Sequence, residues 1–207
     1  VTVAGCENRA EGIEKLIESE RKPQVIIMDD GYQHRQVNPG FKILLTSIDK
    51  LFSRDYLLPA GDLREPRSAY HRADCIIVTK CDENIAETEK ERIAKEIRPS
   101  SNQPLFFSSL VYDEPAHFFS YQTLSLADLK SKQVLLFTGI ADPSQLVKFL
   151  QNTTESLETI QFPDHHDYNE KDISVLKEKY NKFDGQKSIL LTTEKDYQRL
   201  RNTSFIK

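Results

Sequence analysis

The segment CIIVTKCDENIAETEKERIAKEI, residues 75–97, decides the fold class, because it combines a buried strand with a helix. Cys75–Thr79 is a short, continuous apolar run, which is typical of a strand covered on both faces. In Glu83–Ile97, isoleucines form a sparse stripe on a heavily charged helix. This pattern suits a helix that lies on a sheet with its outer face in water. A strand followed by a helix, when repeated along a chain, predicts parallel βαβ units.

The same alternation continues on both sides of this segment. Further apolar runs predict buried strands at Val1–Ala4, Gln24–Met28, Lys42–Ile48, Val134–Thr138, Leu157–Phe162 and Ser188–Thr192. The stretches that predict further helices are Gly12–Glu20, Pro143–Asn152 and Asn169–Tyr180. We therefore expect an α/β protein with a mostly parallel sheet.

The alternation breaks once, between about Pro104 and Lys132. Here two apolar runs, residues 105–112 and 117–121, flank the turn-forming residues 113–116 and predict an antiparallel hairpin. Two antiparallel strands between two α/β stretches indicate a link between lobes. We therefore place a boundary near residue 113 and expect a second, smaller α/β domain from about residue 124 onward.

Length and composition limit the possible classes of protein. The 207 residues, 38% hydrophobic and 29% charged, are typical of a globular protein with one large domain or two small ones. The net charge of -4 argues against a nucleic-acid binder held by bulk positive charge. No window approaches the roughly 18 apolar residues that a membrane-spanning helix requires. The three cysteines lack metal-ligand spacing and predict reduced thiols in a cytosolic compartment.

Paired carboxylates follow the apolar run Val25–Met28. Asp29 and Asp30 would lie at the carboxyl edge of a parallel sheet, where α/β proteins bind ligands. In phosphate-transferring enzymes such a strand-end Asp holds Mg²⁺. The alternative is a simple turn, because Asp-Gly is a favoured turn dipeptide. The three hydrogen-bonding side chains at residues 33–35 favour a site, since they lie in the same loop.

Two further loops leave alternatives open. In residues 57–67, Arg64 and Arg67 could bind phosphate or carboxylate, or could belong to a solvated loop with a local Arg–Glu pair. Thr79-Lys80-Cys81-Asp82 fits the N/T-K-x-D pattern with which GTPases recognise guanine. It also suits a polar loop in which Asp82 lies near the start of the next helix.

Adjacent histidines, His165 and His166, follow the predicted strand Leu157–Phe162. Their side chains should diverge, so at most one faces a given cleft. The alternatives are a metal pair, a general base oriented by Asp164, and an exposed polar loop. A zinc site is disfavoured because no third ligand lies at a suitable spacing.

The last predicted strand is followed by Thr193, Lys195 and Asp196. Thr193 is expected to act as the N-cap of a final helix, with Asp196 three residues later. Lys195 could still face an anionic substrate.

Six stretches together closely resemble the tetraacyldisaccharide 4'-kinase family, the lipid A 4'-kinases of Gram-negative bacteria. In chain order they are DDGYQHR (29–35), LLPAGDLREP (57–66), RAD (72–74), FTGIADP (137–143), FPDHHDY (162–168) and LTTEKD (191–196). They recur in the family's order and cover almost the whole chain, so the set is far more specific than any single piece.

The resemblance implies a P-loop NTPase-like fold with a mostly parallel sheet, truncated here, and a smaller C-terminal α/β lobe joined by a two-stranded linker. Residues 1–112 would be the Walker B-containing part of the kinase domain, 113–123 the second half of the hairpin linker, and 124–207 the C-terminal lobe. The implied reaction is Mg²⁺-dependent transfer of the γ-phosphate of ATP to the 4'-hydroxyl of a tetraacylated disaccharide 1-phosphate, the lipid A precursor. It would take place at the cytoplasmic face of the bacterial inner membrane, with no nucleic-acid partner.

The resemblance also implies roles for individual residues. Asp29 and Asp30 would be the Walker B carboxylates that hold Mg²⁺, and Asp30 would also take part in catalysis. His165, next to Asp164, would help to activate the acceptor hydroxyl. The implied substrate-binding residues are Arg9, Gln33, His34, Arg64 and Glu65.

The sequence departs from the family pattern in several places. It lacks a Gly-rich P-loop with a Lys-Ser/Thr pair, the Gly-Asp-Glu-Pro segment and the apolar N-terminal helix, and it has no initiator Met. We therefore expect the C-terminal two-thirds of a kinase, inactive alone, because other parts of the chain cannot replace a phosphate cradle of backbone N–H groups. Phe52–Asp55 stands where the family commonly has Phe-Gly-Asn-Gly. The other interpretations are a GTPase-like nucleotide switch, based on Thr79–Asp82, and a non-catalytic α/β binding module.

Overall fold

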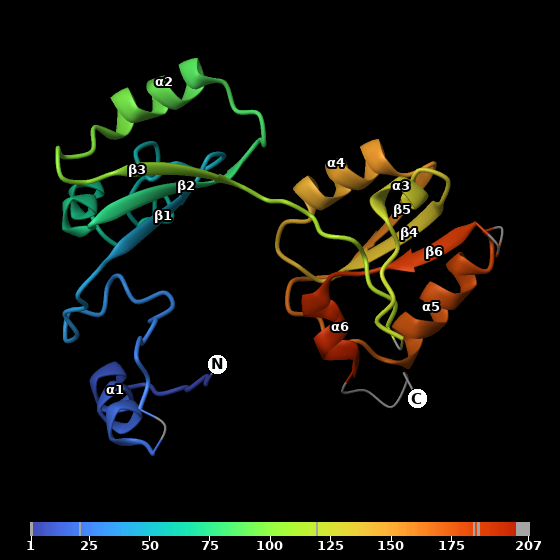
Figure 1. Ribbon diagram of the computed structural model, residues 1–207, viewed down its shortest axis with the longest axis horizontal. Helices are drawn as coiled ribbons and strands as arrows, with labels where there is room; N and C mark the ends of the chain where they lie inside the picture. The colour runs from blue at the N-terminus through green and yellow to red at the C-terminus, as the bar shows by residue number, and fades with distance from the viewer. Residues whose placement is uncertain (1, 21, 119, 184, 186, 202–207) are drawn as a thin grey trace. The chain divides into compact units, whose positions relative to one another are not determined.

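The computed structural model describes residues 2–20, 22–118, 120–183, 185 and 187–201. The chain divides into two compact units, Val1–Tyr112 and Asp113–Lys207. Each unit contains its own three-stranded parallel sheet (Figure 1). The α/β class predicted from the sequence is thus confirmed. Among the described residues, no helix combines the length and the apolar character needed to cross a membrane.

The first unit is built around the sheet β1-β2-β3. Its elements are α1 (Arg9–Glu18), β1 (Ile43–Ser47), the 3-10 helix η1 (Arg67–Arg72), β2 (Cys75–Cys81), α2 (Glu87–Ile97) and β3 (Leu105–Ser109). The central strand β2 pairs in parallel with both neighbours, and α2 lies along one face of the sheet (Figure 1). The unit β2-α2-β3 is therefore the βαβ crossover that the sequence predicted.

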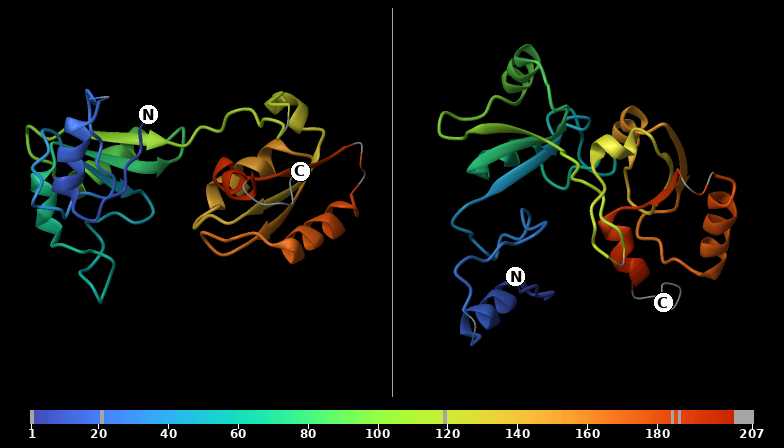
Figure 2. Two further views of the ribbon diagram at one scale, coloured as in Figure 1. Left: turned by 90° about the horizontal axis from the view of Figure 1, so that it is seen from below. Right: turned by 45° about the vertical axis from the view of Figure 1, so that its right-hand side comes forward.

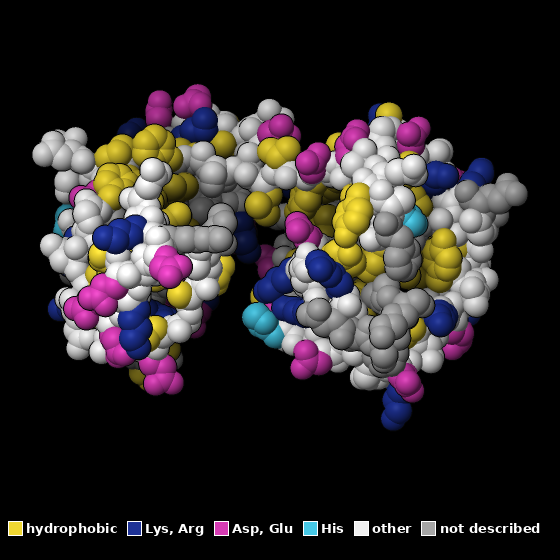
Figure 3. All heavy atoms as spheres, turned by 60° about the horizontal axis from the view of Figure 1, so that its bottom comes forward, with side chains coloured by type: hydrophobic (Ala, Val, Ile, Leu, Met, Phe, Trp, Pro, Cys, Tyr) yellow, Lys and Arg dark blue, Asp and Glu magenta, His cyan; other side chains and the backbone are white. Residues whose placement is uncertain are grey.

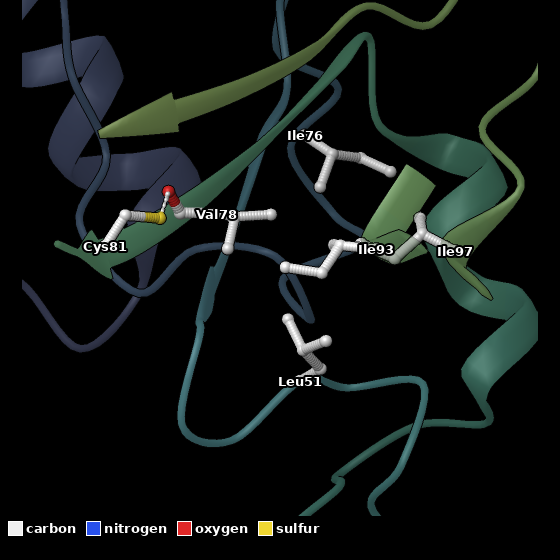
Figure 4. Packing of buried hydrophobic residues seen from close by; sticks show 6 residues of the cluster. All are labelled: Leu51, Ile76, Val78, Cys81, Ile93 and Ile97. Atoms are coloured by element: carbon white, nitrogen blue, oxygen red, sulfur yellow. Dashed lines mark hydrogen bonds between the residues drawn. The ribbon is translucent and has the colours of Figure 1, made fainter. Parts of the chain in front are cut away.

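The core of the first unit lies between β2 and α2. Ile76 and Val78 of β2 pack against Ile93 and Ile97 of α2, and each of the four is at most 3% exposed (Figure 4). The two helix residues are four positions apart, so they lie on the same face of the helix. These two residues belong to the stripe of isoleucines that the sequence predicted for this charged helix.

The opposite face of this sheet is uncovered in the described part of the chain. Ile43 and Leu45 of β1 are 50% and 62% exposed, and Phe106 of β3 is 53% exposed. Hydrophobic side chains accordingly reach the surface of the first unit (Figure 3). Because parallel sheets are usually covered on both faces, this open face sets the first unit apart from an ordinary α/β domain.

The second unit is built around the sheet β5-β4-β6. Its elements are α3 (Leu126–Leu129), β4 (Gln133–Thr138), α4 (Ser144–Thr153), β5 (Ser156–Gln161), α5 (Glu170–Tyr180), β6 (Ser188–Leu191) and α6 (Glu194–Arg201). All strand pairs are parallel.

Helices cover both faces of this second sheet (Figure 2). Val134 and Leu136 of β4 pack against Leu150 of α4 on one face. Phe137 points to the other face and packs against Leu176 of α5. All five side chains are at most 3% exposed, which explains the continuous apolar run of β4.

Two predicted strands are not formed. Residues 2–4 of the predicted strand Val1–Ala4 form no strand, and Val1 lies outside the described residues. Gln24–Met28 is likewise not a strand, and Val25 and Ile27 are 75% and 89% exposed. An apolar run becomes a strand only where a neighbour pairs with its backbone N–H and C=O groups. The prediction that Asp29 and Asp30 lie at the carboxyl edge of a sheet is therefore wrong for this structure.

The predicted hairpin is displaced along the chain. Leu105–Ser109 forms β3 and pairs in parallel with β2, so its antiparallel pairing with residues 117–121 is wrong. A shorter antiparallel contact joins Ala116 to Thr123 instead. The apolar run suits either partner, and pairing with β2 buries one of its faces in the core of the first unit. Phe119, in the second predicted strand, lies outside the described residues.

Candidate active site

In the first unit, charged and aromatic side chains form what we call the Asp30 cluster, which comprises Asp30, Tyr32, Arg35, Arg64, Glu65 and Arg72. Arg64 Nη1 donates a hydrogen bond to Asp30 Oδ2 at 3.0 Å, and the side chains of this pair are 60% and 72% exposed. Asp30 has a φ of 47°, a left-handed conformation that Asp adopts more readily than most residues. The Asp-Gly stretch is therefore a turn, and this turn contacts the loop that contains Arg64.

Glu65 is the least exposed charge of this cluster, at 14% of its side chain. Its carboxylate accepts hydrogen bonds from Arg72 at 2.6 Å and from Arg35 at 3.2 Å. The hydrogen bond from Arg72 is the main cause that lowers the pKa of Glu65, and the bond from Arg35 adds to it against the opposing effect of burial. Arg72 also lies over the ring of Tyr32, 4.8 Å from its centroid. The described partners of Glu65, Arg35 and Arg72, both lie outside residues 57–67, so these contacts are not the pair local to the loop that the sequence allowed.

The loop before Arg64 is held by its own hydrogen bonds. The Asp55 carboxylate accepts from the backbone N–H of Tyr56 at 2.8 Å, and the N–H of Leu63 donates to the carbonyl of Tyr56 at 3.0 Å. A Cβ at Gly61 would lie 2.2 Å from Asp55 Oδ1 and 2.4 Å from the Tyr56 carbonyl oxygen. Only glycine fits this close approach, so the Gly in the motif has a packing role.

The remaining predicted residues of the first unit lie outside these contacts. Three of them are exposed in the turn around Asp30: Asp29, Gln33 and His34. Arg9 begins α1, and its guanidinium donates to the Cys6 carbonyl within its own segment. The described contacts therefore pair Asp30 with Arg64, and Glu65 with Arg35 and Arg72; they do not include Arg9.

The Thr79–Asp82 motif is not a loop. Thr79, Lys80 and Cys81 continue β2, and α2 begins only at Glu87. The expectation that Asp82 lies near the start of this helix is therefore wrong.

In the second unit, three motifs meet in what we call the Asp196 cluster, which comprises Gly139, Asp164, His165, Thr193, Asp196 and Arg199. Asp196 is fully buried, at 0% exposure. Its carboxylate accepts from the Gly139 N–H at 3.0 Å, the Thr193 hydroxyl at 2.7 Å and Arg199 Nη1 at 3.0 Å. The Asp196 N–H donates to Thr193 Oγ1 at 3.2 Å, which confirms the predicted cap. A buried carboxylate is stable only when it is paired and hydrogen-bonded in this way.

Gly139 lies at the centre of these contacts. A Cβ at this position would lie 3.1 Å from Asp196 Oδ1, 3.2 Å from His166 Cβ and 3.3 Å from the Pro163 carbonyl oxygen. Its own carbonyl accepts from Arg199 Nη1 at 2.8 Å and from the His165 N–H at 3.2 Å. The Gly139 backbone therefore connects helix α6 to the turn that carries the histidines.

His165 is exposed and contacts charged neighbours. Its side chain is 72% exposed and its φ is 58°. Its Nδ1 lies 3.2 Å from Arg199 Nη2, within hydrogen-bond distance. Its Nε2 lies 3.6 Å from Asp164 Oδ2, which is too far for a hydrogen bond. Lys195 Nζ lies 3.9 Å from the other Asp164 oxygen, so Arg199 and Asp164 are the charged neighbours of this histidine and Lys195 is a neighbour of Asp164.

His166 points away from His165 and into the protein. Its Nε2–H donates to Asp172 Oδ2 at 2.9 Å, and its ring stacks on Phe162 with centroids 4.7 Å apart. Tyr168 meets the same ring edge-on at 5.1 Å. The two histidines thus diverge as predicted, and His166 serves packing.

Sequence reasoning missed Arg199, Asp172 and Gly139 as parts of this site. Arg199 lies three residues after Asp196 on a helix, a spacing that pairs side chains and could have suggested the ion pair. Asp172 belongs to the capping box of α5 with Asn169, which the Asn-x-x-Asp pattern could have indicated. For Gly139 no local signal exists, because its role depends on helix α6.

Comparison with known proteins gives a consistent result. The family model LpxK, Tetraacyldisaccharide-1-P 4'-kinase, matches residues 1–206. A tetraacyldisaccharide 4'-kinase of Flavobacterium johnsoniae is 41% identical over 206 residues, which cover 100% of this chain and 58% of the relative. The enzyme of that name from Bacteroides thetaiotaomicron is 39% identical and is matched over 97% of this chain and 55% of the relative.

A solved structure is also similar. The crystal structure of LpxK from Aquifex aeolicus in complex with ATP has a TM-score of 0.58 and 28% identity, and the match covers 92% of this chain and 52% of that chain. The chain spans about half the length of the curated relatives it matches. On the family match over residues 1–206, the chain belongs to the LpxK family of tetraacyldisaccharide-1-P 4'-kinases.

Proposed function

We propose that this chain is part of a kinase that transfers the γ-phosphate of ATP to the 4'-hydroxyl of tetraacyldisaccharide 1-phosphate, the lipid A precursor. The family match over residues 1–206 carries this proposal. In this proposal, residues 1–112 are the Walker B-containing part of the kinase domain, 113–123 are linker and 124–207 are the C-terminal lobe. The reaction takes place at the cytoplasmic face of the inner membrane. The 207 residues alone are inactive, because their sequence contains no Gly-rich P-loop.

The carboxylates of the first unit suit Mg²⁺. This ion prefers oxygen ligands and usually binds through one or two carboxylates together with substrate phosphates. Asp30 accepts a hydrogen bond from Arg64 through Oδ2, and the adjacent Asp29 is exposed; in this proposal these two carboxylates would supply the protein oxygens. When bound, the ion would neutralise negative charge on the phosphates.

An amphiphilic substrate suits the loop before Arg64. Arg64 is 60% exposed, and Tyr56, Leu57 and Leu58 are 64%, 46% and 61% exposed. The loop thus presents apolar side chains next to a guanidinium, and an acylated sugar phosphate combines the complementary groups. We also assign substrate contacts to Arg9, Gln33, His34 and Glu65, with Glu65 acting by orienting Arg35 and Arg72.

His165 is the residue that we assign to the acceptor hydroxyl. It is exposed, lies next to Asp164 and belongs to a turn fixed by the buried Asp196 cluster. Phosphoryl transfer depends mainly on positioning and on electrostatic stabilisation, and a side chain on a fixed turn can supply both.

The test is a transfer assay with the full-length protein, Mg²⁺ and ATP labelled at the γ-phosphate. We expect the label on the disaccharide 1-phosphate at its 4'-oxygen. A matched acceptor in which hydrogen replaces the 4'-hydroxyl should stay unlabelled. Label recovered only as inorganic phosphate, or a strong preference for GTP over ATP, would contradict the proposal.

A further inference from the structure

We propose that Arg199 is a positioning residue for His165: it occupies Nδ1 and leaves the Nε2–H as the group that faces the substrate. This inference rests on the proposed function, in which His165 meets the acceptor. It also changes the role of His165 from the general base suggested by its sequence to a hydrogen-bond donor.

Arg199 is itself held firmly. One of its nitrogens, Nη1, donates to Asp196 Oδ1 at 3.0 Å and to the Gly139 carbonyl at 2.8 Å. Its side chain is 18% exposed, and the carboxylate it neutralises is fully buried. Because the guanidinium is planar, fixing one nitrogen also fixes the direction of the other. That other nitrogen, Nη2, lies 3.2 Å from His165 Nδ1.

This contact decides which ring nitrogen of His165 carries the proton. A guanidinium in a protein does not lose its proton, so Arg199 can only donate, and Nδ1 must accept. A neutral imidazole has one N–H and one acceptor nitrogen, which places the proton on Nε2. A proton on Nδ1 would set two donors against each other, and in the doubly protonated ring also two cations, so the contact fits only the neutral ring with Nε2–H.

The protonated nitrogen is open to a ligand. Nε2 is 3.6 Å from Asp164 Oδ2, beyond hydrogen-bond distance, and the side chain is 72% exposed. The other oxygen of this carboxylate, Asp164 Oδ1, lies 3.9 Å from Lys195 Nζ. An N–H held in this way can stabilise charge that develops on an oxygen during phosphoryl transfer, without taking a proton.

Nitrogen NMR of the histidine rings tests the proposal without any assay of activity. In the ¹⁵N-histidine-labelled chain at about pH 8, above the ordinary histidine pKa of about 6.5, we expect His165 to have a bare Nδ1 and a protonated Nε2. Arg199→Met should give a mixture of both tautomers, and Arg199→Lys should retain most of the Nε2–H form. Arg201→Met, on the same helix, is the matched control and should change nothing. His166, bonded to Asp172, serves as an internal reference.

A predominant Nδ1–H form in the wild-type chain would overturn the proposal, as would an unchanged His165 spectrum in Arg199→Met. If the Arg199→Met variant unfolds because Asp196 loses its partner, the tautomer of His165 in the wild-type chain still tests the proposal. In the full-length kinase, Arg199→Met should lower kcat by up to about 10²-fold with little change in KM, and Arg199→Lys should restore part of the loss. A wild-type protein without kinase activity would refute the proposed function while leaving the NMR result intact.

Discussion

The Asp30 cluster and the Asp196 cluster hold their charges in different ways. The Asp30–Arg64 pair is 72% and 60% exposed and joins two side chains. Asp196 is fully buried and accepts from a backbone N–H, a hydroxyl and a guanidinium. Exposed pairs typically contribute about 0.2–1 kcal/mol, whereas breaking a buried pair costs about 3–5 kcal/mol. The second unit therefore carries a preorganised cluster, and the Asp30 pair can rearrange at little cost.

The largest effect on turnover is expected for His165, which is exposed on the turn that the Asp196 cluster holds in place. In the full-length kinase, His165→Ala should lower kcat by about 10²–10³-fold, the usual cost of removing one positioned donor. His166→Ala is the matched control and should change kcat little. Its ring is packed between Phe162 and Tyr168, so His166→Ala should instead lower the melting temperature.

Turnover assays combined with thermal unfolding measure both variants. If His166→Ala removed turnover while His165→Ala left it intact, the assignment of the two histidines would be reversed.

Asp196→Ala should be the most damaging change to stability. It leaves the charge of Arg199, which is only 18% exposed, without its partner, and we expect a loss of about 3 kcal/mol in the free energy of unfolding. Asp30→Ala, the matched change in the exposed Asp30–Arg64 pair, should cost less than about 1 kcal/mol. Urea unfolding of both variants measures the difference, and equal losses would break the contrast between the clusters.

Gly139→Ala tests how tightly the second cluster is packed. The added methyl group would contact Asp196, His166 and Pro163 at 3.1–3.3 Å, so we expect a loss of about 1–3 kcal/mol. Gly185→Ala is the control in the same unit, because no atom of the described residues lies within 4 Å of a Cβ there. An unchanged free energy of unfolding in Gly139→Ala would mean that the turn at Gly139 rearranges easily to accommodate the methyl group.

Glu96 lies in the first unit but is partly buried. It therefore tests whether the strength of a charge pair depends on its exposure or on the unit to which it belongs. Hydrogen bonds from Arg54 and Ser53 lower the pKa of Glu96 from 4.5 to about 2, and its side chain is 28% exposed. Because the folded-state pKa is lowered, the stabilisation is complete above about pH 4.5 and is lost as the pH falls towards 2. Glu96→Gln should therefore cost about 1 kcal/mol at neutral pH after solvent screening.

Unfolding free energies measured from pH 7 down to pH 3 should show the difference between Glu96→Gln and wild type shrinking. Glu91→Gln, an exposed neighbour on the same helix, should track the wild type throughout. A difference that stays constant with pH would exclude Glu96 ionisation as its cause.

The strands of both sheets could be predicted from the sequence because each apolar run packs at least one of its faces against helices. Gln24–Met28 has the same pattern, yet Val25 and Ile27 are exposed, since no neighbouring strand in the described residues pairs with them. The run 105–112 was assigned to the wrong partner, because an apolar pattern does not specify the strand with which it pairs.

The candidate site was predictable only where it depends on local spacing. The divergence of His165 and His166 follows from their adjacency, and the Thr193 cap follows from the three-residue spacing to Asp196. The role of Arg199 was missed because its partners, His165 and Gly139, are 34 and 60 residues away in the chain. Such contacts depend on how the helices pack on the sheet.

Amide hydrogen exchange of this chain tests the contrast between the two clusters most directly. The Gly139 N–H donates to the buried Asp196 carboxylate, so we expect exchange close to the rate of global unfolding of the second unit. Asp30 is exposed and belongs to no helix or strand, so its amide should exchange nearly as fast as in an unfolded peptide. Comparable protection at Gly139 and Asp30 would contradict the view that the Asp196 cluster is preorganised while the exposed Asp30–Arg64 pair is not.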